Sequence, residues 1–381
     1  MIETIERTRC AVNGAADLEH LYTFRDFPVF MGCVDGPAEE DMTADMVWGI
    51  GRSSGMVQLQ KLLPLDVLYR DSHAAGSVGG LWAEHHRAFA SFIMRYAPRS
   101  VFEIGGGHGI LSRECRAIRS VDWTILEPNP PKECEPDGPR YIRGFFDENF
   151  VLDRPVDAVV HSHLFEHIYD PNVFVENLGR FLRGGGKMFF SVPNMSVMLE
   201  RKYTNTVNFE HTILLADEYV AYLLAEHGFE ILAKERFKDD HSVFYACAAG
   251  RPPRPAALPA GLYERNKGLF MDYVDFHLDL VRGLSGRMRA TRRPVYLFGA
   301  HVFSQYLFAF GLETERIAAV LDNAETKQGK RLYGTDLSVL SPKILARCPD
   351  EPVVILRAGV YNEEIKRDIL DNINPRTEFW T

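Results

Sequence analysis

The clearest chemical signal in the sequence is a glycine-rich turn between an apolar stretch and a helical pattern. Residues 102–111 read FEIGGGHGIL, so that Glu103, Gly105, Gly107 and Gly109 are spaced as E-x-G-x-G-x-G. Glycine lets the backbone turn tightly and come close to a ligand, and the start of the following helix offers N–H groups that have no partner within the helix. The turn therefore predicts a ligand site at the end of a strand.

Two kinds of ligand use such a turn. A dinucleotide site needs G-x-G-x-x-G, but Ile110 occupies the position of its third glycine. The spacing found here is typical of S-adenosylmethionine sites, in which an acidic residue after the second strand binds the ribose hydroxyls. Glu127, in TILEPN, stands there, and its carboxylate oxygens are acceptors that suit a diol. We expect Glu127, the glycines and His108 to hold this cofactor, with Glu103 facing its amino-acid end.

The elements around the turn alternate between strand and helix patterns from residue 81 to residue 250. Strand patterns occupy residues 100–105, 122–128, 140–146, 156–163, 187–193 and 242–249, and helical patterns occupy 81–97, 109–118, 170–182 and 216–229. This alternation predicts an α/β domain, a mostly parallel sheet covered by helices in the Rossmann-like manner. The glycine turn would lie at the carboxyl edge of that sheet.

Two other units flank this central domain. Residues 1–80 lack a strong helical period and predict an irregular N-terminal lobe of short strands and loops, in which 55–63 is the best strand. Residues 251–261 belong to a proline-rich linker, because proline suits neither a sheet interior nor the middle of a helix. Residues 262–381 begin with a long amphipathic helix and continue as a second Rossmann-like α/β domain, which opens at 293–311 with another strand–glycine–helix pattern.

Composition excludes several classes of protein. The formal net charge is −9, and an acidic chain is a poor nucleic-acid binder because such affinity comes largely from neutralising phosphates. The six cysteines form no C-x-x-C pair, which argues against a zinc ribbon or a redox dithiol. No secretory signal and no apolar run of about 18 residues is present. We therefore expect a cytoplasmic enzyme with no membrane partner.

With these features the chain resembles the sugar C-methyltransferases, which methylate nucleotide-linked keto-deoxysugars. The resemblance covers nearly the whole chain, and three segments carry it: GMVQLQKLLPLDVLY at 55–69, FEIGGGHG at 102–109, and LFGAHVFSQYL followed by VLDNAETKQGKRLYGTDLSV at 297–339. It implies an N-terminal zinc-binding segment, a central S-adenosylmethionine domain and a C-terminal Rossmann-like domain. It also implies a nucleotide sugar as the methyl acceptor and S-adenosylhomocysteine as a product.

The resemblance also implies catalytic residues. The family's E-H pair is matched by Glu210-His211 in VNFEHTILLADEY, and its histidine after the fourth strand by His167. In the family, the histidine of the pair takes a proton from the carbon next to the ketone, and the resulting enolate attacks the methyl group. A histidine of near-neutral pKa suits this step. Glu210 would orient or polarise it, and His167 would assist the ketone oxygen as charge develops there.

The chain departs from the family at the zinc-binding segment. Cys10 remains from the first C-x-x-C pair, but Asn13 stands at its partner position, and Gly51 and Ser54 stand where the second pair falls. A structural zinc site is normally four-coordinate. We therefore interpret the segment as degenerate and expect no metal.

The residues expected to touch the acceptor differ as well. Asn208 replaces a family tyrosine, and the stretch after Tyr69 contains His73 but no further tyrosine. The C-terminal domain lacks a phosphate-binding glycine fingerprint. It either forms a structural wall of the substrate cleft or recognises the nucleotide part of the acceptor. Its candidate contacts, Tyr361 and Asn362, lie at a strand-to-helix turn. These differences leave open O- or N-methylation of another small molecule, and a catalytically silent binding protein.

Overall fold

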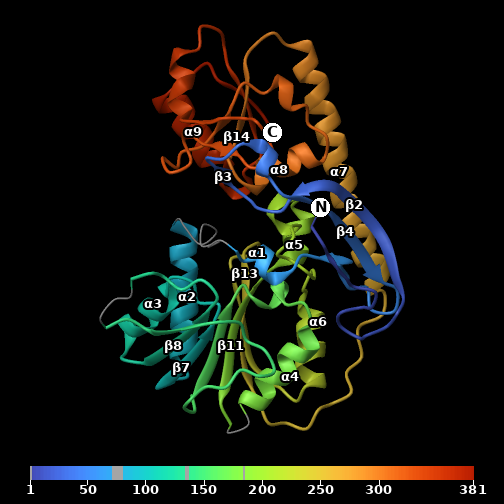
Figure 1. The fold of residues 1–381 in the computed structure, drawn as a ribbon, viewed down its shortest axis with the longest axis vertical. Helices are drawn as coiled ribbons and strands as arrows, with labels where there is room; N and C mark the ends of the chain where they lie inside the picture. The colour runs from blue at the N-terminus through green and yellow to red at the C-terminus, as the bar shows by residue number, and fades with distance from the viewer. Residues whose placement is uncertain (1, 71–79, 134–136, 183–184) are drawn as a thin grey trace.

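The computed structural model describes residues 2–70, 80–133, 137–182 and 185–381. Three units pack together in it, and the long helix α7 (Leu262–Ala290) runs from the N-terminal lobe to the C-terminal domain (Figure 1). The predicted substrate residue His73 lies outside the described residues. None of the described helices is both long and apolar enough to pass through a bilayer.

The central unit is built on a seven-stranded sheet with the order β12-β13-β11-β10-β7-β8-β9. Its strands are β7 (Ser100–Ile104), β8 (Asp122–Glu127), β9 (Arg140–Arg143), β10 (Ala158–Ser162), β11 (Lys187–Pro193), β12 (Glu230–Phe237) and β13 (Ser242–Ala248). Five adjacent strands, in the order β11-β10-β7-β8-β9, are parallel to one another, whereas β13 is antiparallel to both β11 and β12. The predicted α/β fold with a mostly parallel sheet is confirmed.

Helices cover both faces of this sheet, which is why its inner strands are apolar on both sides. On one face, α2 (Gly80–Met94) and α3 (Ile110–Ile118) pack on residues such as Val101 and Val160. On the other face, α4 (Pro171–Phe181) and α6 (Asp217–Glu226) pack on residues such as Phe102 and Val159. The edge strand β12 was not expected, because its sequence EILAKERF is largely exposed and lacks a buried-strand pattern.

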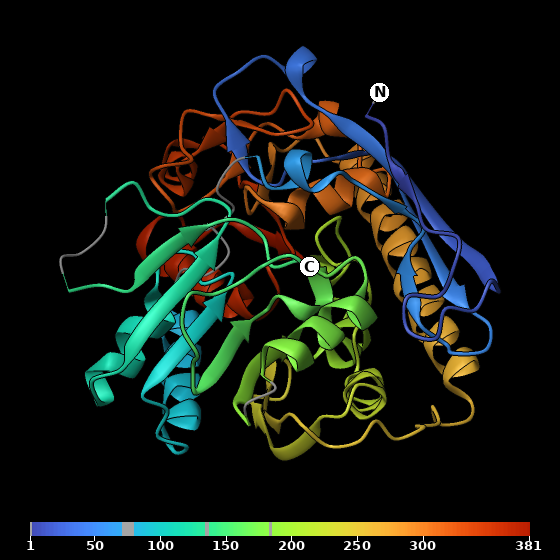
Figure 2. The same ribbon diagram turned by 60° about the horizontal axis from the view of Figure 1, so that its bottom comes forward.

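The N-terminal lobe differs from its prediction. It contains two long antiparallel strands, β2 (Leu18–Pro28) and β4 (Thr43–Gly51), where short strands were expected. Two register shifts interrupt β2, so its buried residues do not follow the alternation from which a strand is recognised. The expected strand at 55–63 is divided into β5 (Val57–Leu59) and β6 (Lys61–Leu62). In Figure 2 the blue strands of this lobe lie along the orange helix α7.

The C-terminal domain carries a five-stranded, fully parallel sheet with the order β17-β15-β14-β18-β19. Its elements are β14 (Val295–Phe298), α8 (Val302–Ala309), β15 (Val320–Leu321), β17 (Val339–Leu340), β18 (Val353–Leu356), α9 (Asn362–Asn372) and β19 (Glu378–Trp380). The strand β3 (Cys33–Val34) of the N-terminal lobe pairs with β16 (Arg331–Leu332) of this domain. This pairing ties the first and last units together.

Of the four positions at which the resemblance implies zinc ligands, three hold a residue other than cysteine. Cys10 is buried, and its Sγ lies 3.1 Å from the Ser54 hydroxyl. A Cβ atom on Gly51 would lie 3.2 Å from the same sulfur, and the Asn13 amide donates to the neighbouring Ser53 hydroxyl. Cys10 is thus the one thiol at these four positions, and its hydrogen bond with Ser54 joins two of them.

Candidate active site

A cavity of about 660 Å³ lies at the carboxyl ends of the central strands, and residues from all three units line it. Among the predicted site residues, those that line it are Tyr69, Glu103, Gly105, Gly107, His108, Glu127, His167, Asn208, Glu210, His211 and Tyr361. A second cavity of about 710 Å³ lies elsewhere on the central unit, between Tyr96 and Lys187, and none of the predicted residues lines it. The tertiary structure thus gathers the cofactor and catalytic candidates in one place.

The glycine turn opens directly into this cavity. Gly105, Gly107 and Gly109 have φ values of +73°, +50° and +67°, a region that glycine enters without steric cost. A Cβ atom on Gly107 would meet nothing within 4 Å, so the backbone is open to a ligand there. The Glu127 carboxylate accepts hydrogen bonds from the N–H groups of Gly107 (3.0 Å) and Asn129 (3.1 Å). A turn with an acid fixed beside it fits a nucleoside with free ribose hydroxyls.

Two predicted cofactor residues support the turn from inside the protein. Glu103 is buried and accepts a 2.7 Å hydrogen bond from the Trp123 indole. Burial, together with the charge of Glu127, raises the pKa of Glu103 to about 7. Gly109 begins α3 and does not line the cavity, because a Cβ atom there would lie 2.7 Å from the Tyr141 hydroxyl. The expected contact of Glu103 with the amino-acid end of the cofactor stays a prediction.

The Glu210-His211 pair is held by the side chain of Asn208. Its Oδ1 accepts the N–H groups of Glu210 (2.8 Å) and His211 (3.0 Å), which fixes a tight turn. The His211 Nδ1 lies 2.7 Å from the Thr206 carbonyl oxygen, which can only accept, so Nδ1 carries the proton. The Nε2 lone pair is then free to act as a base. Burial lowers the pKa of His211 to about 4, so the ring is neutral near pH 7.

His167 lies beside this pair, and a residue absent from the sequence prediction lies behind it. The rings of His167 and His211 are 5.2 Å apart, and the Tyr69 hydroxyl is 3.3 Å from His167 Nδ1. Glu166 is fully buried, and neither of its oxygens has a hydrogen-bond partner among the described residues. Burial raises the pKa of Glu166 to about 8. The signal for Glu166 was its place next to His167 in the same segment after β10.

The C-terminal domain contributes a turn that repeats the arrangement of the glycine turn. The Asp322 carboxylate accepts the Ala300 N–H (2.9 Å), as Glu127 accepts that of Gly107. Lys327 donates to Asp322 at 3.0 Å, and both residues line the cavity. The predicted contact Asn362 is not among the lining residues, because its Oδ1 accepts the Ala358 N–H. Its role in substrate binding stays a prediction.

Comparison with known families agrees with this geometry. Residues 81–234, which contain the glycine turn, match the family model described as a methyltransferase domain. The central unit is a methyltransferase domain. S-adenosylmethionine is the cofactor expected of such a domain, and the turn with Glu127 fits it. Residues 269–376 match a second family model, described as a C-methyltransferase C-terminal domain.

Individual relatives of the methyltransferase domain are distant. The C-methyltransferase NovU of Streptomyces niveus is 27% identical over 95% of this chain and 93% of its own length. A Mycobacterium tuberculosis protein named "Probable S-adenosylmethionine-dependent methyltransferase Rv3030" is 28% identical over 39% of this chain. A Mycolicibacterium smegmatis protein of the same description is also 28% identical over 39%. The chain spans about half the length of the mycobacterial relatives, 55% and 60% of each.

Proposed function

We propose that the protein transfers a methyl group from S-adenosylmethionine to the carbon beside a ketone, on a nucleotide-linked deoxysugar. The observation that supports this most is the shared cavity, in which the glycine turn, the Glu210-His211 pair and the Asp322 turn of the C-terminal domain meet. The similarity of residues 269–376 to C-methyltransferase C-terminal domains supports carbon as the receiving atom. We place the reaction in the cytoplasm, in keeping with free thiols at all five cysteines that the structure describes.

In this mechanism His211 is the base. Its Nε2 takes a proton from the carbon next to the ketone, because Nδ1–H is already committed to the Thr206 carbonyl. The electron pair of that C–H bond becomes the enolate. The bound cofactor supplies an electrophilic methyl carbon on a sulfonium. The enolate carbon would take that methyl group, S-adenosylhomocysteine would leave, and His211 would then release its proton to water.

The developing charge on the ketone oxygen needs a donor. Tyr69 and His167 lie together on the cavity wall and offer an O–H and an imidazole. Burial raises the pKa of Tyr69 well above its usual value, so its hydroxyl keeps its proton near neutral pH. The Glu210 Oε2 lies 3.9 Å from His167 Nδ1 and would hold that ring in place.

The C-terminal domain would bind the nucleotide part of the acceptor. Asp322, Lys327 and Tyr361 line the cavity from that domain, and a cation beside hydrogen-bonding groups suits a phosphate-bearing ligand. The sequence leaves two roles for this domain, a structural wall or recognition of the nucleotide. Recognition accounts for the turn at Ala300, whose N–H is bonded to the Asp322 carboxylate beside the cavity.

Transfer of labelled methyl from S-adenosylmethionine to pooled nucleotide sugars tests the proposal. With an active acceptor, His211→Gln should lower kcat by 10²- to 10⁴-fold, the usual contribution of a general base, and leave the affinity for S-adenosylhomocysteine unchanged. His20→Gln is the matched control, since His20 is an exposed histidine outside the cavity. A full rate in the His211 variant would favour O- or N-methylation, and cofactor binding without any product would favour a silent binding protein.

A further inference from the structure

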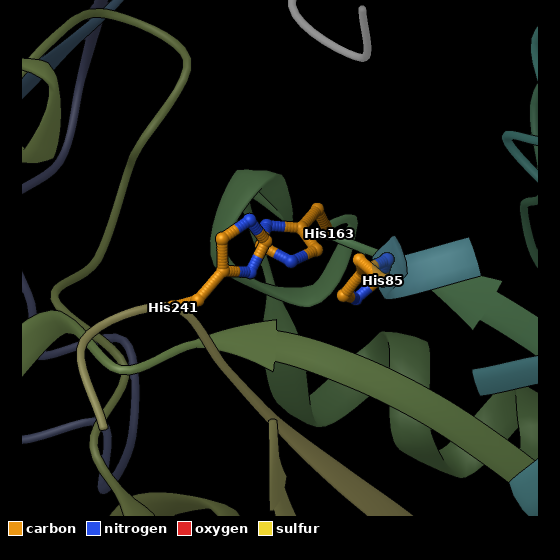
Figure 3. Close-up of side chains that lie close together, drawn as sticks. All are labelled: His85, His163 and His241. Atoms are coloured by element: carbon orange, nitrogen blue, oxygen red, sulfur yellow. The ribbon is translucent and has the colours of Figure 1, made fainter. Parts of the chain in front are cut away.

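Three histidines from separate elements meet at the wall of the cavity (Figure 3). His85 lies on α2, His163 directly follows β10, and His241 lies between β12 and β13. One nitrogen of each ring lies within 4.8 Å of a nitrogen of each of the others. The ring centroids are 5.2 to 5.9 Å apart. These residues are close in space because the carboxyl end of β10 and the turn between β12 and β13, which lies beside the carboxyl end of β11, both approach α2.

The hydrogen bonds of this cluster do not use all of its nitrogens. His85 is fully buried: its Nε2 lies 2.9 Å from the Ser191 hydroxyl, and its Nδ1 has no hydrogen-bond partner within the described part of the chain. The Ser242 hydroxyl serves two rings, at 2.9 Å from His163 Nε2 and 2.5 Å from His241 Nδ1. One hydroxyl has a single proton to donate. Buried polar atoms without partners are costly and call for a physical cause, such as a bound ion.

The surroundings keep these imidazoles in the form that binds metals. Burial lowers the pKa of His85 to about 2 and that of His241 to about 4, and it places the pKa of His163 well below its ordinary value. All three rings are therefore neutral near pH 7, and a neutral imidazole is a metal ligand. The Glu166 Oε1 lies 3.6 Å from His163 Nδ1, where a carboxyl oxygen commonly orients a metal-bound histidine.

We propose that His85, His163 and His241 bind one divalent transition-metal ion of the zinc type, with a fourth position open to the cavity. His163 and His241 line that cavity, so the open position would face water or an oxygen of a bound molecule. Metal–nitrogen bonds of about 2.1 Å require the three nitrogens to close in from their present spacing. His241 lies in a short turn between the edge strand β12 and its neighbour β13, and a shift of this turn would supply that movement.

A second group of possible ligands lies beside the first one. Atoms of Glu166, His167 and His211 are also within 4.8 Å of one another. There, however, His211 Nδ1 is already bonded to Thr206, and His167 Nδ1 is near both Tyr69 and Glu210. The group of His85, His163 and His241 offers three imidazoles, whereas the second group offers two imidazoles and a carboxyl, so the first is the better match to the nitrogen ligands of zinc.

Metal titration of the full chain tests this site without cofactor or acceptor, so the result is independent of the proposed reaction. The protein is freed of metal with a chelator and titrated with Zn²⁺ against a coloured competitor, and with Co²⁺ followed by visible absorption. We expect one equivalent of either metal, with the intense bands of low-coordinate Co²⁺. His163→Asn and His241→Gln should each weaken binding at least tenfold.

The variants are chosen so that the result stays interpretable. Asparagine tolerates the left-handed backbone of position 163, where φ is +49°, and circular dichroism checks that each variant is folded. His211→Gln and the distant His20→Gln should keep wild-type affinity. The proposal is overturned if the wild type takes up no stoichiometric metal, if both cluster variants bind as tightly as the wild type, or if His211→Gln abolishes binding instead. If His163→Asn fails to fold, the His241→Gln result decides.

Discussion

Glu166 and His163 form the link between the two histidine groups of the cavity, with Oε1 of the acid 3.6 Å from Nδ1 of the imidazole. The same oxygen lies 3.7 Å from His167 Nε2. Because burial raises the pKa of Glu166 to about 8, this carboxyl is neutral near pH 7 and has a proton to donate. Its protonation therefore affects both the proposed catalytic residues and the proposed metal ligands.

The first prediction concerns the effect of Glu166 on stability. In the unfolded chain its pKa is near 4.5, and in the folded protein it is about 8. The unfolded state therefore loses this proton first as pH rises, and the contribution of Glu166 to stability, full below pH 4.5, falls until about pH 8. The loss is at most about 1.4 kcal/mol per pH unit. Urea unfolding of the two proteins should show that, as pH rises, the free energy of unfolding of the wild type falls relative to that of Glu166→Gln.

A pH-independent difference between these two proteins would contradict that prediction. Glu103, the other buried acid with a raised pKa, is present in both proteins and cancels in the comparison. Asp157→Asn is a suitable control, because the Asp157 pKa is lowered by hydrogen bonds from the N–H groups of Arg99 and Ser100. The stability that Asp157 contributes should therefore fall as pH falls, which is the opposite pH dependence to that of Glu166.

The second prediction concerns cofactor affinity. Glu127→Gln removes the negative charge that the Gly107 N–H contacts and that ribose hydroxyls would contact. Hydrogen bonds to a charged group contribute about 1.5–3 kcal/mol, so calorimetry should show binding of S-adenosylhomocysteine weakened by roughly 10- to 100-fold. Glu148→Gln, an exposed acid outside the cavity, should bind normally. Equal affinity in the two variants would remove Glu127 from the site.

The third prediction separates two glycines of the turn. Alanine at either position costs about 1–2 kcal/mol because both have left-handed φ values. Gly109→Ala should cost more, since its Cβ would lie 2.7 Å from the Tyr141 hydroxyl. Gly107→Ala has free space around its Cβ, and that space is the cavity. The Gly107→Ala variant should therefore lose only a few degrees of melting temperature, less than Gly109→Ala, yet bind S-adenosylhomocysteine weakly. The reverse pattern in melting and calorimetry would refute this assignment.

The fourth prediction concerns Asn208 as a positioning residue. Asn208→Ala removes the acceptor of two N–H groups in the Glu210-His211 turn, so His211 should lose its fixed position. We expect kcat for methyl transfer to fall at least tenfold, with the affinity for S-adenosylhomocysteine unchanged. Asn208→Asp keeps the accepting oxygen and should restore much of the rate. If aspartate rescues nothing, the amide of Asn208 acts in another way, for instance directly on the acceptor.

Much of the fold was predictable because its signals are local. The strand KMFFSVP is observed as β11 with the expected bounds, and the long helix at 262–290 is observed as α7. The strand β2 was not predictable, since its two register shifts remove the alternation of buried residues. The exposed edge strand β12 carries no burial signal at all, and only its pairing with β13 makes it a strand.

The sequence by itself determined the glycine turn, the acid at Glu127 and the Glu210-His211 pair, because each depends on residue types at short spacing. Only the tertiary structure decided that Glu166 is a buried acid whose oxygens accept no hydrogen bond within the described part of the chain, and that His85, His163 and His241 meet. The three histidines are at least 78 positions apart in the sequence, and they meet because α2, β10 and the β12–β13 turn pack together within the central unit. Burial then sets the ionisation of these groups, because a charge loses its hydration inside the fold.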